Sequence, residues 1–68
     1  MKIGTKIKIL PSNELDNIGL MPLAGVTGIV MQVKHDREGK LSGAWVRLPG
    51  KWNGEREWFI PEVSLSIF

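Results

Sequence analysis

The feature that most constrains this chain is an alternation of apolar and polar residues with the two-residue period of β-strands. Ile3, Thr5, Ile7 and Ile9 share one side of the first segment, and lysines alternate with them on the other side. No segment keeps a helical period over the length of an ordinary helix. Eight glycines and four prolines interrupt the 68 residues, so the pattern predicts short strands joined by turns.

Four further segments continue the pattern and predict strands at 25–35, 42–48, 55–60 and 64–68. Gly28 marks the place where the second strand bends or where another backbone approaches closely. The turns between the strands are predicted at Asp36–Lys40, with Gly39 supplying a positive φ, and at Pro49–Gly54.

The alternation also assigns each strand residue to a side. The residues expected to face the core of the later strands are Ala44, Val46, Leu48, Trp58, Ile60, Leu65 and Ile67. Those expected to face outward include Trp45, Arg47, Glu55, Glu57 and Phe59. The core assignment therefore separates Trp58 from the other tryptophans.

The long connection Pro11–Leu23 contains many apolar residues for a loop, so we expect it to fold back and cover one end of the core. The stretch Ser12–Leu15 contains residues typical of a helix N-cap, so one helical turn is expected there. Pro61–Ser64 suits a single 3-10 turn before the last strand.

Two short motifs resemble known β-folds. The segment Gly25–Val30 (Gly-Val-Thr-Gly-Ile-Val) is similar to the Gly-x-x-Gly-x-Val element of KOW motifs in transcription and translation proteins. Trp58–Leu65 resembles the strand–Pro–3-10–strand ending of SH3-like barrels. The Pro11–Leu23 connection is longer than the loop that KOW motifs have at this place. The resemblance implies an all-β, SH3-like, five-stranded, strongly bent barrel spanning residues 1–68 as one domain, with a long loop after strand 1 and a 3-10 turn before the last strand.

Composition excludes several kinds of chemistry. The absence of cysteine rules out disulfides, thiol catalysis and cysteine-based zinc sites, and a single histidine argues against a histidine-based metal site. We expect no cofactor and no small-molecule substrate. No apolar run approaches the about 18 residues needed to span a membrane, and the N-terminus lacks the unbroken apolar stretch of a signal peptide. A cytoplasmic location without membrane contact is the resulting expectation.

The chain offers no convincing catalytic group. His35 stands at a strand end beside Asp36, but neighbours in a strand point to opposite faces. Glu55 and Glu57 share a face, yet Arg56 and nearby basic residues favour a solvated charged strand over a general acid–base pair. We therefore expect a protein that is not an enzyme.

The aromatic and basic residues are the candidate binding residues. They are Trp45, Arg47, Lys51, Trp52, Arg56 and Phe59, with a secondary basic face of Lys2, Lys6 and Lys8. Two interpretations stay open for the aromatics. Either the Pro11–Leu23 loop or the chain ends cover Trp45 and Phe59, or these side chains form an exposed aromatic and basic surface. The lysines are interpreted chiefly as a solvated face that blocks edge pairing.

Two functions are compatible with these residues. The first is a small non-catalytic binding module for protein–protein interaction, through self-association or docking to a larger complex, since tryptophan and arginine are enriched at interface hot spots. The alternative is a KOW-like barrel that binds RNA or single-stranded DNA, in which aromatics would stack on bases. A net charge of only +2 favours the first, because phosphate-driven binding depends on many cations.

Overall fold

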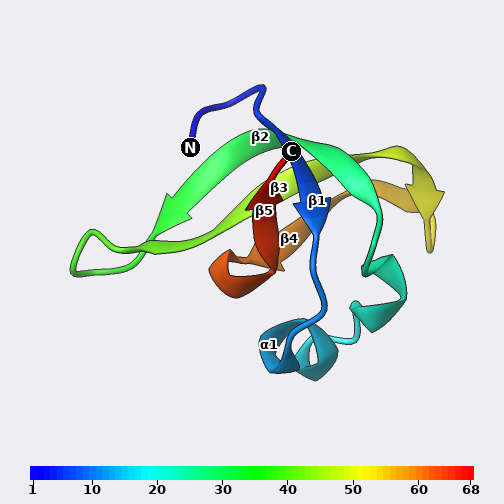
Figure 1. Cartoon of the computed structure of the whole chain (residues 1–68), viewed down its shortest axis with the longest axis horizontal. Helices are drawn as coiled ribbons and strands as arrows, with labels where there is room; N and C mark the ends of the chain where they lie inside the picture. The colour runs from blue at the N-terminus through cyan, green and yellow to red at the C-terminus, as the bar shows by residue number, and fades with distance from the viewer.

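A computed structural model describes all 68 residues as a five-stranded antiparallel sheet with little helix (Figure 1). The strands are β1 (Lys6–Ile9), β2 (Thr27–His35), β3 (Leu41–Trp52), β4 (Glu55–Pro61) and β5 (Leu65–Ile67). The long connection contains α1 (Asn13–Asn17) and the 3-10 turn η1 (Met21–Leu23), and η2 (Glu62–Ser64) precedes β5. The predicted all-β class, the long loop after the first strand and the final 3-10 turn are confirmed.

The sheet has the order β4-β3-β2-β1-β5 and remains open, with β4 and β5 as its edges. Closure into a barrel would require hydrogen bonds between these edges, and η2 instead leads the chain from β4 to the far side of β1. The expected ring of strands is therefore not formed. The sheet bends strongly (Figure 1), and the register of β2 against β3 shifts between Val30 and Gln32, just beyond the bend expected at Gly28.

The close approach of another backbone that was predicted at Gly28 is present, and the neighbouring backbone is that of Arg47 on β3. A Cβ atom on Gly28 would lie 2.8 Å from the carbonyl oxygen of Arg47 and against the side chain of Val46. Glycine is needed here because the two strands approach each other more closely than a side chain allows.

The core lies on the concave side of the sheet and combines strand and loop residues. Its fully or almost fully buried members are Ile7, Ile9, Leu15, Leu20, Leu23, Val30, Ala44, Val46, Leu48 and Ile60. Three of the ten come from the α1–η1 connection, so the prediction that this loop covers the core is confirmed. No helix of the structure is long and apolar enough to cross a membrane.

Ser12 fixes the position of the loop in two ways. Its hydroxyl accepts a hydrogen bond from the backbone N–H of Leu15 at 3.0 Å, which caps α1 as predicted. The same hydroxyl lies 2.6 Å from the hydroxyl of Ser64, which is fully buried. The loop and η2 are therefore joined by a polar contact at the margin of the core.

Two residues expected on the apolar side of a strand, Ile3 and Ile67, are exposed instead. Ile3 is 69% exposed because β1 begins only at Lys6, after a turn in which Gly4 has a φ of 92°. Ile67 is 67% exposed although it pairs with the buried Ile7. It lies on an edge strand of three residues, where no other element covers it.

The β3–β4 hairpin is longer than predicted. Its turn is only Asn53–Gly54, whose φ values of 54° and 87° are those of the two-residue type I′ hairpin turn. β3 continues through Pro49, because the segment 48–51 forms an irregular bulge opposite the single residue Arg56. The predicted turn at Pro49–Gly54 is therefore wrong at its beginning. The other predicted turn is confirmed, with Gly39 at a φ of 82°.

Candidate functional site

Four aromatic residues of the β3–β4 hairpin form two edge-to-face pairs. The ring centroids of Trp45 and Phe59 are 5.9 Å apart with an interplanar angle of 70°, and those of Trp52 and Trp58 are 5.2 Å apart at 73°. Trp52 and Trp58 pack against the core, and the indole N–H of Trp58 donates to the carbonyl oxygen of Glu55 at 3.0 Å. We call Trp52–Trp58 the inner pair and Trp45–Phe59 the outer pair.

The outer pair owes its arrangement to strand register and to Gly43. Trp45 on β3 is directly opposite Phe59 on β4, so both side chains stand on the same face of the sheet. A Cβ atom on Gly43 would lie 2.5 Å from Cζ of Phe59, which means that the phenyl ring lies on the glycine backbone. Trp45 remains 37% exposed, so the pair presents an aromatic surface to solvent.

The outer pair borders a surface cavity of about 550 Å³, which we call the β4 groove. Its lining residues come from the loop, from β3 and from β4, and they are Ile18, Leu20, Trp45, Glu55, Glu57, Trp58 and Phe59. The loop therefore forms one wall of the groove and does not close over Trp45. Ile18, 48% exposed, is the outermost apolar residue of that wall.

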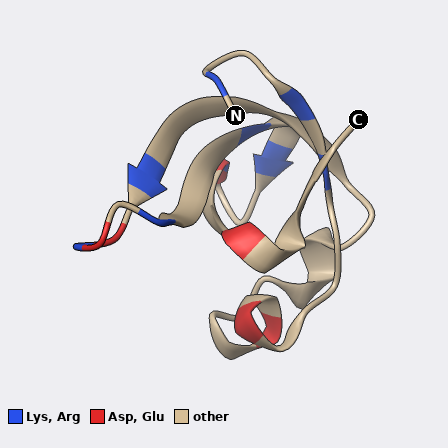
Figure 2. Ribbon diagram, turned by 60° about the vertical axis from the view of Figure 1, so that its left-hand side comes forward, with Lys and Arg blue, Asp and Glu red and all other residues tan.

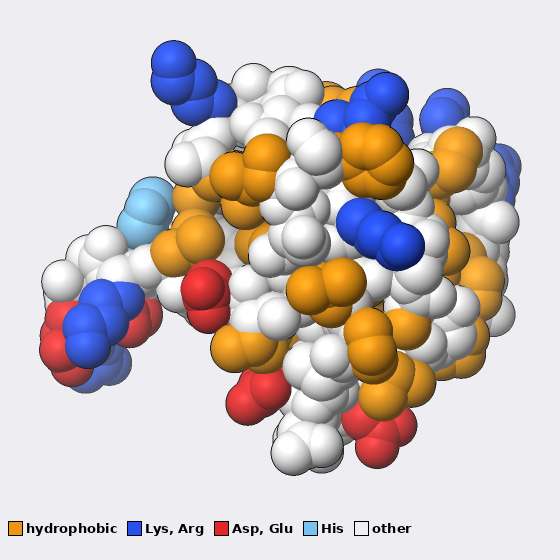
Figure 3. Space-filling view, viewed as in Figure 1, with side chains coloured by type: hydrophobic (Ala, Val, Ile, Leu, Met, Phe, Trp, Pro, Cys, Tyr) orange, Lys and Arg blue, Asp and Glu red, His pale blue; other side chains and the backbone are white.

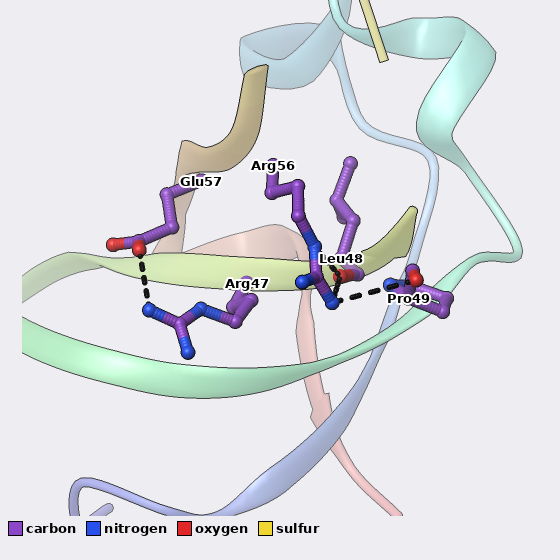
Figure 4. Close-up of polar contacts among 5 residues, drawn as sticks. All are labelled: Arg47, Leu48, Pro49, Arg56 and Glu57. Atoms are coloured by element: carbon purple, nitrogen blue, oxygen red, sulfur yellow. Dashed lines mark hydrogen bonds and ion pairs between the residues drawn. The ribbon is translucent and has the colours of Figure 1, made fainter. Parts of the chain in front are cut away.

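The β4 groove has two carboxylates in its lining. Glu57 accepts a hydrogen bond from Nη2 of Arg47 at 2.9 Å, and both side chains are exposed (Figure 4). Glu55 is exposed and forms no ion pair. The groove thus combines an apolar interior with one free negative charge and one that a neighbouring arginine partly offsets.

The guanidinium of Arg56 forms hydrogen bonds with backbone carbonyl groups of the same chain. Its Nε and Nη2 donate to the carbonyl oxygen of Leu48 at 3.3 and 3.1 Å, and Nη2 also reaches that of Pro49 at 3.4 Å (Figure 4). These carbonyls belong to the bulged part of β3, which has lost its regular ladder partners. The guanidinium therefore supplies hydrogen bonds that the bulge would otherwise lack.

A second, smaller cavity of about 230 Å³ lies over the middle of the sheet. Its lining combines three cationic residues with strand backbone, and comprises Lys6, Thr27, Gly28, Ile29, Arg47, Leu48, Pro49 and Arg56. Arg47, Ile29 and Lys6 occupy one row across three strands, because Ile29 pairs with both of the others. Figure 2 shows this distribution of charge, with basic positions along the strands and acidic positions on α1.

The predicted binding residues therefore fall into separate groups. Trp45 and Phe59 lie in the β4 groove, whereas Arg47 and Arg56 line the second cavity with Lys6. Trp52 belongs to the inner pair. The exposed Lys51 stands in the bulge and lines neither cavity.

The lysines of the secondary face are also separated. Lys6 and Lys8 are exposed on β1, whereas Lys2 precedes the strand, in a turn where its backbone N–H donates to Thr5. The interpretation that they block edge pairing is wrong, because β1 lies between β2 and β5 in the sheet.

Groups with catalytic or metal-binding potential lie apart from one another. His35 is exposed at the end of β2, and no hydrogen bond joins its ring to a carboxylate. The carboxylate of Asp36 instead accepts hydrogen bonds from the backbone N–H groups of Glu38 and Lys40. No cluster of three or more histidine, aspartate and glutamate side chains is placed to hold a metal ion.

Sequence reasoning did not place Ile18, Leu20, Glu55, Glu57 and Trp58 in a common site. Ile18 and Leu20 were expected to cover the core, which Leu20 does, and the two glutamates were interpreted as a solvated strand face. The available signal was the excess of apolar residues in a loop, without an indication of what they face. Comparison of the chain with family models, curated proteins and solved structures gave no match.

Proposed function

We propose that this chain is a non-catalytic binding module that docks a segment of another protein in the β4 groove. We further propose that its architecture is SH3-like and related to KOW barrels. The sheet order, the long connection after β1 and the 3-10 turn before β5 support this reading of the fold.

The observation that carries the proposal is the outer aromatic pair at an open, apolar cavity. At about 550 Å³, the β4 groove is as large as many small-molecule pockets, which measure about 300–1,000 Å³, so it has room for a side chain of a partner. Trp45 is large and 37% exposed, whereas Trp52 and Trp58 of the same hairpin are partly buried against the core. Aromatic residues beside a pocket are frequent anchors of interfaces, so a partner side chain that fills the groove would gain apolar burial.

The charges of the groove define the chemistry of the partner. Glu55 forms no ion pair in the chain, and the carboxylate of Glu57 is paired with the guanidinium of Arg47. Complementary charge favours a segment in which an apolar side chain is flanked by lysine or arginine. The non-catalytic part of the proposal is supported by the isolated, exposed position of His35.

Selection from a library of displayed random peptides tests this function directly. Peptides that bind the folded chain should share an apolar residue next to lysine or arginine, and they should lose binding to the Trp45→Ala variant. Lys51→Ala is the matched control, because Lys51 is exposed and lies outside the groove. Enriched peptides that bind Trp45→Ala as well as the original chain would contradict the proposal.

Self-association is the other form of protein interaction that the residues allow. Light scattering at high concentration distinguishes it from docking, since docking to another protein leaves the isolated chain monomeric. A concentration-dependent dimer that the Trp45→Ala substitution dissociates would show that the groove binds a second copy of the chain and not another protein.

Nucleic-acid binding is a second candidate, and the cavity lined by Lys6, Arg47 and Arg56 supports it. Two of these cations already have partners in Glu57 and in the backbone of β3, and the outer pair lies beside carboxylates that repel phosphate. Titration of labelled single-stranded RNA and DNA at about 50 mM salt tests this candidate, because binding to phosphates falls steeply as salt rises. Salt-sensitive binding that Lys6→Ala weakens would favour it over docking of a peptide.

A further inference from the structure

We infer that the occupant of the β4 groove binds as an additional β-strand along the free edge of β4, with alternating cationic and apolar side chains. This inference rests on the proposed function and specifies how the partner binds. It concerns a short extended segment of another protein, which would become the sixth strand of the sheet.

The β4 backbone from Arg56 to Ile60 is available for such pairing, whereas the carbonyl oxygen of Glu55 already accepts a hydrogen bond from the indole N–H of Trp58. β4 is an edge strand whose only neighbour in the sheet is β3. Among the backbone hydrogen bonds outside the regular elements, none involves residues 55–60. In an edge strand, alternate N–H and C=O groups point away from the sheet, and a peptide that adds as a strand satisfies them.

The groove lies along this edge and includes both faces of the strand. Glu57 and Phe59 belong to the outer face of β4, and Trp58 belongs to the inner face, yet all three line the same cavity. A cavity on one face of a sheet would be lined by alternate residues only. The opposite wall is the loop segment with Ile18 and Leu20, so the space between loop and strand lies beside the β4 backbone.

The two faces of β4 determine which types of side chain are favoured on each face of the added strand. Its outward side chains would lie next to Glu55 and Glu57, where cations are favoured. Its inward side chains would lie between Trp58 and the loop residues Ile18 and Leu20, where apolar groups are favoured. An alternating cationic–apolar sequence satisfies both faces at once, because cross-strand neighbours on one face interact directly.

A second copy of the chain fits this edge less well. Two β4 strands related by a two-fold axis perpendicular to the sheet would place identical residues opposite each other at the centre. Centring on Arg56 or Glu57 opposes like charges, and centring on Trp58 or Phe59 leaves Glu57 opposite an uncharged residue, Phe59 or Pro61 respectively. Like charges directly opposite in a sheet are destabilising, so charge complementarity favours a basic segment from another protein.

The other edge of the sheet lacks these features. β5 has three residues, and neither cavity lies beside it. Exposed apolar residues occur near it, including Ile67 at 67% and Phe68 at 73% exposure. Figure 3 shows that hydrophobic side chains on this face occur in separate groups with basic side chains between them. The face offers neither a long edge nor a continuous apolar groove.

The test uses the synthetic peptide acetyl-Lys-Val-Lys-Leu-Lys-Val-amide and two N-methylated isomers. One isomer is methylated at the first, third and fifth positions, and the other at the second, fourth and sixth. Alternate N–H groups of a strand point to opposite edges, so one isomer should keep its affinity and the other should lose at least tenfold. Binding is measured by titration of the ¹⁵N-labelled chain, together with hydrogen exchange of residues 55–60.

Two further arms test the charge pattern. A peptide with glutamate in place of lysine should not bind, and Glu55→Gln should weaken the lysine peptide about threefold to fivefold, as expected for an exposed charge pair. Glu62→Gln is the matched control, because it removes the same charge from an exposed position on η2 outside the groove. Glu62→Gln should bind as the original chain does.

The outcomes separate this inference from the proposed function. Equal affinity of both methylated isomers, with chemical shift changes at Trp45 and Phe59, would overturn strand addition and leave docking in the groove intact. Absence of binding by the lysine peptide and both isomers would overturn strand addition. If the selection from displayed peptides also gave no peptide that binds through Trp45, the proposed docking function would be wrong as well.

Discussion

The inner and outer aromatic pairs belong to the same two strands and have nearly the same geometry, yet they stand in different environments. Trp52 and Trp58 pack against the core, and the indole N–H of Trp58 is bonded to the backbone. Trp45 and Phe59 stand beside an open groove. The difference shows that the contact between two rings does not decide their role. What decides it is how far other apolar groups cover them, and Trp58 takes part in both environments because it packs against the core and also lines the groove.

The strongest test of this contrast is Trp58→Ala. Removing the indole should lower the free energy of unfolding by about 3 kcal/mol, near the lower end for truncating an aromatic residue in a core, because Trp58 is only half-buried. Urea denaturation followed by circular dichroism measures the loss. A variant as stable as the original chain would show that the inner pair does not support the core, and the comparison would fail.

Gly43→Ala tests the outer pair through the surface on which Phe59 lies. The new methyl group would meet the phenyl ring and the backbone of Ile60, so we expect a loss of about 1–3 kcal/mol, the usual cost of overpacking. Displacement of the ring should also shift the NMR signals of Trp45. Unchanged signals together with unchanged stability would show that Phe59 does not depend on Gly43.

Ser12→Ala tests how firmly the loop wall of the groove is held. The substitution removes the cap of α1 and leaves the buried hydroxyl of Ser64 without its partner, which should cost about 1–2 kcal/mol. Hydrogen exchange should quicken at residues 12–20 more than in β3. Ser66→Ala is a suitable control, because no hydrogen bond of the Ser66 side chain is present in the structure. Equal effects of both substitutions would argue against a specific anchor.

Trp45→Ala should have the smallest effect on stability and the largest on binding. The expected loss in the free energy of unfolding is smaller than that of Trp58→Ala, and the edge-to-face contact contributes about 0.5–1.5 kcal/mol of it in addition to the area that the ring buries. Binding of the lysine peptide should fall at least tenfold. If Trp45→Ala destabilised the chain as much as Trp58→Ala, the two pairs would have the same structural role.

A large part of the fold follows from local pattern. The alternation at 42–48 correctly placed Ala44, Val46 and Leu48 inside and Trp45 outside, because adjacent side chains in a strand must point to opposite faces. The helical turn expected at Ser12–Leu15 from its N-cap residues is present as α1, which Ser12 caps. The same alternation failed for Ile3 and Ile67, since period alone does not show where a strand begins or whether another element covers its end.

The candidate site was predicted only in part. Trp45 and Phe59 were expected outside, and the structure brings them together through the register of β3 and β4. Arg56 was expected to belong with them, but the bulge at 48–51 directs its guanidinium to backbone carbonyls. A bulge depends on how two strands pair over their whole length, and the sequence of one strand does not specify it.

The sequence by itself determined approximately where the five strands lie, which side of most of them is apolar, and that a long apolar loop covers the core. These properties depend on neighbours along the chain, within a few residues. Only the tertiary structure decided that the sheet stays open at β4, that Ile18 and Leu20 stand opposite that edge, and that Trp52 and Trp58 pack against the core while Trp45 stays exposed. Those outcomes depend on strand register and loop path, which join residues that are distant in the sequence, and they create the groove on which the proposed function depends.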